Sequence, residues 1–236
     1  MEQRTFLLQA GYLLHQRAYG ERDAILELFC REHGRLGLFA RGVRAGRSRR
    51  RGVLQPFSEL LLSWRARGEL GQLSDVEARG VPRLPSGKAL LSGFYLNELL
   101  MRLLRRDDPN PRLYDSYGYA LSRLAGGEAE APTLRIFEKH LLAELGYGLL
   151  LEHDCGGTPI AAEQIYDYRL EQGPVPCAEG AARLSVHGDC LLALARERFG
   201  SPRQLKQSKL LLREALAVHL GERPLRSREL YLRRVQ

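Results

Sequence analysis

The sequence predicts an α+β protein, in which a small closed barrel of five strands precedes an α-helical domain with an irregular insertion. Residues 1 to about 80 contain short apolar runs between Gly-rich turns, a pattern typical of small barrels. Beyond Pro82 and Pro85, apolar residues recur at helical spacing. Residues 151 to about 185 are rich in Gly, Pro and Tyr but show little periodicity. We therefore expect domains at 1–80 and 81–236, with the insertion inside the second.

The N-terminal region offers five candidate strands. Gly34 lies in the turn between the second and the third, where a left-handed backbone is expected, and residues 68–71 turn into the fifth. A long arginine-rich loop at 45–52 separates the third strand from the fourth. The expected strands are residues 11–18, 24–29, 36–43, 57–64 and 72–77.

The second region reads as helices with recognisable ends. Residues 87–106 place a stripe of leucine and tyrosine residues at steps of four, which indicates one buried helix face. Asn110-Pro111 starts a second helix, and Gly126-Gly127 ends it. Further helices are expected at 132–145, at about 188–199 and at 202–220, where Ser201 is the N-cap. A short hairpin is expected around 165–168.

The composition excludes several classes of protein. The hydrophobic fraction of 44% can fill real cores, so the chain is not a disordered basic tail. No apolar run is long enough for a membrane span, and the run at residues 6–8 is too short for a signal peptide. The four cysteines show no tight paired spacing, which favours a soluble protein of a reducing compartment.

The strongest functional signal is a cluster of arginines between residues 35 and 67. This window holds nine arginines and one acid, Glu59, so its formal charge of +8 equals that of the whole chain. A second excess, eleven Lys or Arg against four acids, begins at residue 196. Cations on a small sheet suit a polyanion, most often nucleic acid. With Arg17, which extends the track, the candidate DNA-binding residues are Arg17, Arg35, Arg41, Arg44, Arg47, Arg49, Arg50, Arg51, Arg65 and Arg67.

Two interpretations of this cluster are open. The arginines either neutralise phosphates, which would make affinity fall steeply with salt, or form a solvated loop that keeps the protein soluble. The lack of interleaved acids favours phosphate binding. Tyr19, Phe39 and Trp64 are candidates for stacking on bases, although each also suits a core position. No zinc finger, basic zipper or helix-turn-helix is present, so binding without sequence specificity is expected.

The chain resembles the RecO family of bacterial DNA repair proteins over nearly its whole length. No single segment is specific, but their ordered set is. In chain order the segments are GYLLHQR (11–17), REHGR (31–35), ARGVR (40–44), LQPF (54–57), LLLSW (60–64), RGEL (67–70), GFYLNELL (93–100), LGYG (145–148) and PLRSREL (224–230).

The resemblance implies an N-terminal OB-fold and a C-terminal helical domain. It implies a recombination mediator, not an enzyme, that binds single- and double-stranded DNA and anneals complementary strands. It also implies help in loading recombinase onto DNA coated with single-strand-binding protein, in the RecFOR pathway and together with RecR. Such a protein is cytoplasmic and acts at the bacterial nucleoid during repair.

The resemblance also implies a receptor for the acidic C-terminal tail of single-strand-binding protein. Because this tail ends in an apolar residue and a carboxylate, the receptor needs an apolar pocket beside a cation. Arg135 matches a family position associated with that pocket, and Phe137 or Leu141 could form its wall. The alternative is that Arg135 is an ordinary exposed helix residue. Arg226 and Arg228 either contact DNA or a partner, or pair with Glu222 and Glu229.

The insertion departs from the family pattern, which often includes a zinc module of two CxxC pairs. Thr158 stands where the partner of Cys155 is expected, and Gly180 where that of Cys177 is. We expect no cofactor, because short CxxC turns are what aim two thiolates at one ion. Zinc remains an alternative only if an irregular site forms from His153, Cys155, Cys177 and Cys190, or His187 in place of Cys190.

Two other functions remain as alternatives. One is an RNA-binding OB-fold adaptor, which the 2′-hydroxyl of RNA would distinguish from a DNA-binding protein. The other is a metal-dependent nuclease that uses Asp107 and Asp108, although Asp-Asp-Pro is also a typical helix end. No phosphate-binding loop, HExxH motif or catalytic triad is recognisable, so no catalytic residues are assigned.

Overall fold

A computed structural model of the chain describes residues 4–46, 48–66, 70–80, 85–178, 183–227 and 229–230. The chain forms two compact units. The first comprises Met1–Glu128 together with Pro224–Gln236, and the second comprises Ala129–Arg223. No helix in the described ranges is long and apolar enough to cross a membrane.

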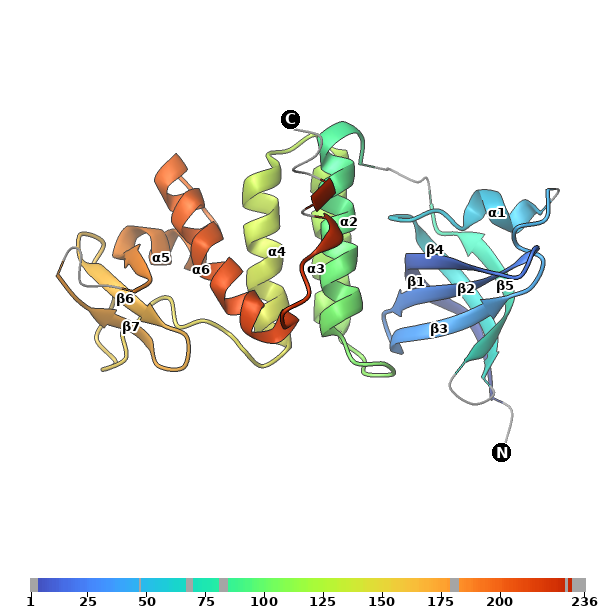
Figure 1. Ribbon diagram of the computed structural model, residues 1–236, viewed down its shortest axis with the longest axis horizontal. Helices are drawn as coiled ribbons and strands as arrows, with labels where there is room; N and C mark the ends of the chain where they lie inside the picture. The colour runs from blue at the N-terminus through green and yellow to red at the C-terminus, as the bar shows by residue number, and fades with distance from the viewer. Residues whose placement is uncertain are drawn as a thin grey trace. The chain divides into compact units, whose positions relative to one another are not determined.

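The first unit begins with a closed five-stranded barrel, which confirms the predicted fold class (Figure 1). The strand order around the barrel is β1-β2-β3-β5-β4. Among the described barrel strands, β3 and β5 pair in parallel whereas the other neighbours pair antiparallel, and β4 closes the barrel by pairing with β1. This arrangement matches the OB-fold that the resemblance implies. The strands are β1 (Arg4–Tyr19), β2 (Asp23–Cys30), β3 (Gly34–Ala40), β4 (Glu59–Ala66) and β5 (Gly71–Ala78).

The first strand is longer than predicted because it serves two neighbours. Its beginning pairs with β4 and its end pairs with β2. Two register shifts bend it, one between Phe6 and Gln9 and the other between Leu13 and His15. In the first shift Leu8 adopts a φ of 51°, and its N–H donates to Ser63 Oγ. Such bulges let one strand curl around a barrel.

Alternate residues of the strands fill the barrel interior, as the pleat of a strand requires. The loop after β3 adds Val43 and Leu54, and Val53 packs against the same core. The barrel interior is therefore filled by side chains. The core residues from the strands include Leu13, Leu26, Leu28, Leu38, Leu60, Leu62, Trp64, Leu73 and Val76.

Two helices, α2 (Gly87–Leu103) and α3 (Pro111–Ala125), pack against the outside of the barrel in the same unit. The Tyr12 ring of β1 lies 5.0 Å from the rings of both Tyr114 and Tyr117. Asn97 of α2 links the elements: its Nδ2 donates to Leu14 O at 2.9 Å, and its Oδ1 accepts from the Tyr117 hydroxyl. Buried hydrogen bonds of this kind hold the two helices and the barrel in one arrangement.

The turn between α2 and α3 is fixed against β3. Asp107 N donates to Arg35 O at 2.9 Å, and Arg106 forms an ion pair with Glu27 of β2. Gly34 has a φ of 66°, and a Cβ added to it would lie 2.1 Å from Asp108 O. The close approach of two backbones therefore requires glycine at the position that the sequence identified only as a turn.

The second unit contains three helices in its described residues, with a small sheet between the first and second. That sheet has the order β7-β6-β8, so the insertion is more regular than predicted. Ser201 caps α6 by accepting from Gln204 N, as expected, and Gly221 follows the end of this helix with a φ of 66°. The elements are α4 (Glu130–Glu144), β6 (Ile165–Arg169), β7 (Gly173–Pro176), β8 (Ser185–His187), α5 (Gly188–Ala195) and α6 (Pro202–Leu220).

The chain returns to the first unit after Pro224, where Glu98 of α2 binds it. The Glu98 carboxylate accepts from Arg226 N and Ser227 N, both at 2.9 Å, and from Ser227 Oγ at 2.6 Å. Burial raises the pKa of Glu98, but the hydrogen bonds from Ser227 and Arg226 and the charge of Arg102 outweigh burial and lower it. Ser227 therefore donates two hydrogen bonds to Glu98, and its own backbone is helical.

We expect this attachment to weaken in acid. Because the pKa of Glu98 is lowered in the folded state, its contribution is fully present above the ordinary glutamate pKa, about 4.3, and is lost as the pH falls through the lowered value. Hydrogen exchange at residues 225–227, corrected for intrinsic rates, should therefore accelerate below about pH 4. Glu98→Gln should show fast exchange already at pH 7. Glu229→Gln, at an exposed position, is the control, and an unchanged pH profile in Glu98→Gln would contradict the assignment.

Candidate nucleic-acid interface

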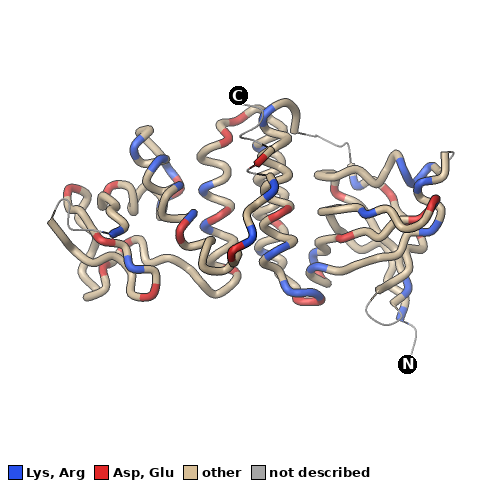
Figure 2. Tube along the Cα trace, viewed as in Figure 1, with Lys and Arg blue, Asp and Glu red and all other residues tan. Residues whose placement is uncertain are grey.

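The segment after β3 turns Val43 and Leu54 into the barrel, while its described arginines are exposed or half-buried. Val43 and Leu54 are almost completely buried, and between them lies the short helix α1 (Arg49–Val53). Asp23 Oδ1 accepts from Gly42 N at 2.7 Å, which ties the segment to the start of β2. The predicted long loop thus contains a short helix and is anchored by Val43 and Leu54 in the barrel core. Lys and Arg positions gather around this part of the barrel (Figure 2).

Five of the predicted arginines have side chains that are available for a ligand. They are exposed, and they form no hydrogen bond or ion pair with any residue that the structure describes. Cations without internal partners keep their full charge for phosphates. These five, hereafter the free arginines, are Arg17, Arg41, Arg49, Arg51 and Arg65.

Two neighbours have structural contacts of their own. Arg44 Nη1 donates to Gly20 O at 3.0 Å, and Arg50 Nη2 donates to Ser74 O at 2.6 Å, with Asp75 at 4.0 Å. Both hold the arginine-rich segment on the barrel while contributing charge to its surface. Arg47 and Arg67 lie outside the described residues.

Arg35 differs from the rest of the cluster. Its guanidinium donates to Met101 O of α2, and its Nε is buried without a partner among the described residues. Burial lowers its pKa, while Glu27 opposes this effect. Strand alternation directs the half-buried Arg35 away from the barrel core and towards α2. Its place in the DNA-binding track stays a prediction, which this contact with α2 does not favour.

The strand register places two free arginines at the ends of one row across the barrel surface. Arg17 pairs with Ile25, Ile25 with Phe39, Phe39 with Gln72, and Gln72 with Arg65. All five side chains are half-buried or exposed, as outward positions require. The sequence did not identify Ile25 or Gln72 as members of this row, because no local pattern predicts the parallel pairing of β3 with β5.

The three aromatic candidates for base stacking differ in burial. Trp64 is 3% exposed and belongs to the barrel core, where it stacks on Phe6. Tyr19 is 57% exposed, and its ring meets the Phe39 ring edge-on at 5.6 Å. Of the three, only Tyr19 and Phe39 lie on the outer surface, beside the row just described.

The predicted tail receptor is not an open pocket. Arg135 is 5% exposed and forms an ion pair with Glu138, which is also buried. Phe137 and Leu141 are fully buried. As these side chains lie, a peptide cannot reach them without rearrangement. The assignment of Arg135, Phe137 and Leu141 to the receptor therefore stays a prediction, which their burial does not favour. Arg226 is exposed, and Arg228 lies outside the described residues.

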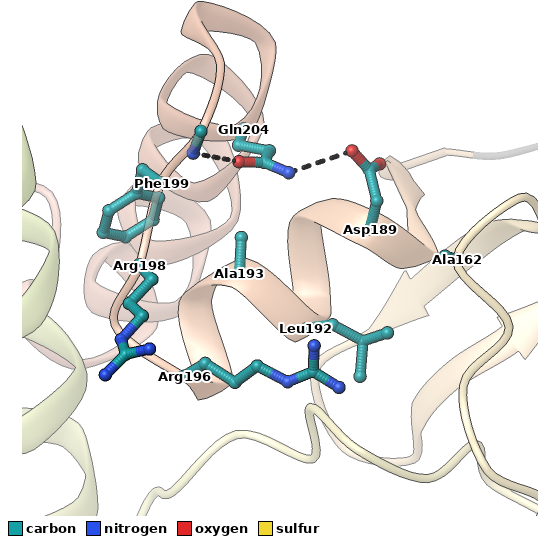
Figure 3. Close-up of a pocket in the computed structure, with 9 residues that line it drawn as sticks. Ala162, Asp189, Leu192, Ala193, Arg196, Arg198, Phe199 and Gln204 are labelled. Atoms are coloured by element: carbon teal, nitrogen blue, oxygen red, sulfur yellow. Dashed lines mark hydrogen bonds between the residues drawn. The ribbon is translucent and has the colours of Figure 1, made fainter.

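The second unit nevertheless has a cavity of about 520 Å³ between α5 and the beginning of α6 (Figure 3). Its apolar lining comes from Leu192, Ala193 and Phe199. Arg196 and Arg198 flank one side, and neither side chain has a partner among the described residues. On the opposite side Gln204 Nε2 donates to Asp189 Oδ2, and Gln204 Oε1 accepts from Gly200 N (Figure 3).

The described residues of the insertion do not fit a zinc ion. Cys155 is exposed whereas Cys190 is 1% exposed, and burial together with Asp189 raises the pKa of Cys190 to about 12, which disfavours the thiolate. Asp154 Oδ1 instead closes the turn after His153 by accepting from Gly156 N and Thr158 N. Within the described ranges, no three His, Cys, Asp or Glu side chains are grouped to hold a metal.

Asp107 and Asp108, the residues of the nuclease alternative, lie in the turn between α2 and α3. Asp107 has a φ of 56° and donates its N–H to Arg35 O. Asp108 lies with its backbone against Gly34. Their conformation is accounted for by the contact of this turn with β3.

Comparison with known proteins relates the barrel region and the helical region to the same family. The family model "Recombination protein O N terminal" matches residues 4–81, and "Recombination protein O C terminal" matches residues 84–229. Proteins described as DNA repair protein RecO align with almost the whole chain. The one from Alkalilimnicola ehrlichii is 50% identical over 229 residues, 95% of this chain and 90% of the relative. Those from Methylococcus capsulatus and Nitrosococcus oceani are 47% and 46% identical over 226 residues, 95% of this chain and 93% and 92% of the relatives.

Proposed function

Because this chain belongs to the RecO family of DNA repair proteins, we propose that it is a mediator of homologous recombination that anneals complementary DNA strands. It binds single- and double-stranded DNA without sequence specificity and helps load recombinase onto DNA coated with single-strand-binding protein, in partnership with RecR. The proposal rests above all on the free arginines around the barrel, whose charge no partner among the described residues compensates.

The chemistry of annealing fits this surface. Two DNA strands repel each other through their phosphates, and guanidinium groups that neutralise both backbones lower that repulsion. Contacts to phosphate carry no sequence information and leave the base edges free to pair. The pairing reaction then follows from Watson–Crick complementarity, and the protein needs no catalytic residue.

The cavity beside α5 supports a role in binding the tail of single-strand-binding protein. A chain end with an apolar residue and a carboxylate needs an apolar wall and a cation, which Phe199 with Leu192 and Arg196 with Arg198 supply in one cavity. This cavity takes the place of the buried Arg135 as the proposed receptor.

The test is the annealing of complementary oligonucleotides coated with single-strand-binding protein, with or without its acidic tail. The chain should accelerate annealing, and removal of the tail should reduce the acceleration. Arg196→Ala with Arg198→Ala should reduce it only when the tail is present. No acceleration, even on bare strands, would contradict the proposed function.

Two further outcomes correspond to the other functions. Shortening of labelled DNA in Mg²⁺ or Mn²⁺ would indicate a nuclease. Tighter binding of RNA than of DNA with the same sequence would indicate an RNA-binding adaptor. Equal acceleration with and without the tail would refute the receptor while leaving the annealing activity in place.

A further inference from the structure

The outer surface of the barrel presents one aromatic ring in a fixed orientation. Tyr19 ends β1 and is 57% exposed. Phe39 of β3 contacts it edge-on, with an interplanar angle of 87° and 5.6 Å between ring centroids. In an edge-to-face pair, one ring braces the other without covering both of its faces. An exposed aromatic residue that is braced in this way has an open surface and restricted motion.

The backbone around Tyr19 is also held in place. Tyr19 pairs with Asp23 across the turn between β1 and β2. Arg44 Nη1 donates to Gly20 O, and Asp23 Oδ1 accepts from Gly42 N. The arginine-rich segment and the turn therefore fix each other, and the ring sits on a scaffold that loses little further entropy on binding.

A free arginine lies near this ring on the same surface. Arg17 lies two residues before Tyr19, so both side chains point outward, about 7 Å apart along the strand. Arg17 also begins the row through Ile25, Phe39 and Gln72 that ends at Arg65. A nucleotide whose base contacts Tyr19 could thus place its phosphate near a guanidinium group.

We propose that Tyr19, supported by Phe39, is a stacking platform for an unpaired base, and that it makes this surface prefer single-stranded DNA. The inference rests on the proposed function and names the form of DNA that this surface recognises. Within a duplex each base is covered by its neighbours, so only an unpaired base can lie on the ring. Tyr19 then adds affinity for single strands alone, whereas the free arginines serve both forms of DNA.

The platform also suits strand annealing. A base that rests on a ring by its face keeps its Watson–Crick edge exposed, so a complementary strand can still pair with it. When a duplex forms, stacking between neighbouring bases replaces stacking on Tyr19. The product therefore loses one contact with the barrel and is released more readily than the single strand.

The experiment compares binding of a single-stranded oligonucleotide and of a duplex by the full chain and by Tyr19→Ala. We expect Tyr19→Ala to weaken binding of the single strand about ten-fold, with the duplex affinity and the salt dependence unchanged. Tyr19→Phe should restore binding, because the ring is retained. Tyr119→Ala is the matched control, since Tyr119 of α3 is also 57% exposed.

An abasic oligonucleotide sharpens the test, because it offers phosphates without bases. The wild-type chain and Tyr19→Ala should bind it equally. Equal weakening of single strand and duplex, or no weakening of either, would overturn the platform while the wild-type chain still bound and annealed DNA. Failure of the wild-type chain to bind either form would instead refute the proposed function.

Discussion

Replacing Arg41, Arg49 and Arg51 together by alanine is expected to weaken binding of single-stranded DNA about 100-fold at ~0.1 M salt. These side chains are exposed and have no partner among the described residues, so their removal leaves the fold intact. Each phosphate contact contributes about 0.7 to the slope of log K against log salt concentration for single strands. If each arginine makes one contact, the slope should decrease by about 2. Fluorescence anisotropy titrations at several salt concentrations measure both quantities.

The control removes the same charge from another surface. Lys206, Lys209 and Arg213 are exposed on α6, and their triple alanine variant should keep most of the salt dependence. Arg50 is left unchanged in the first variant because it holds Ser74 O. If both triple variants lost the same affinity, the effect would be one of net charge and the barrel would not be the specific binding surface.

Gly34→Ala is expected to destabilise the first unit by about 3 kcal/mol or more. The new Cβ would lie 2.1 Å from Asp108 O, and the backbone would have to keep a φ of 66°. The new Cβ and the Asp108 carbonyl oxygen are both held by backbone, and no flexible side chain can move to relieve the clash. The backbones of β3 and of the turn between α2 and α3 would therefore have to separate. Unfolding in denaturant should be followed by tryptophan fluorescence, because Trp64 is the only tryptophan and lies in the barrel core.

Gly42→Ala isolates the cost of the backbone conformation. Gly42 has a φ of 67°, but a Cβ added there would meet no atom within 4 Å, so only the left-handed strain of about 1 kcal/mol is expected. The difference between the two variants then measures the close contact with Asp108. Equal destabilisation by both would show that the contact between β3 and this turn contributes little.

Local patterns predicted the elements well where a signal lies in neighbouring residues. The apolar runs at 24–29 and 57–64, the stripe on α2 and the Ser201-Pro202 start of α6 all correspond to elements of the structure. The bends of β1 and the strand β8 were missed. A bulge is set by the strand on the other side, and three residues are too few to show a period.

The candidate site was predictable to the extent that it depends on charge. The cluster of arginines is visible without a structure, because cations in apolar surroundings without acids have few uses other than binding an anion. The sequence did not show which of these arginines have a hydrogen-bond partner in the folded protein. Arg35 and Arg50 carry the same formal charge as Arg49, but one contacts Met101 O and another Ser74 O.

The sequence by itself determined the fold class, the order of barrel and helices, and the concentration of arginine on the barrel, since each follows from short-range periodicity and composition. The tertiary structure alone decided that Trp64 is inside, that Tyr19 is outside against Phe39, and that Arg135 is buried. Burial and register depend on contacts between residues far apart in the chain, and local periodicity contains no information about which distant segments will meet.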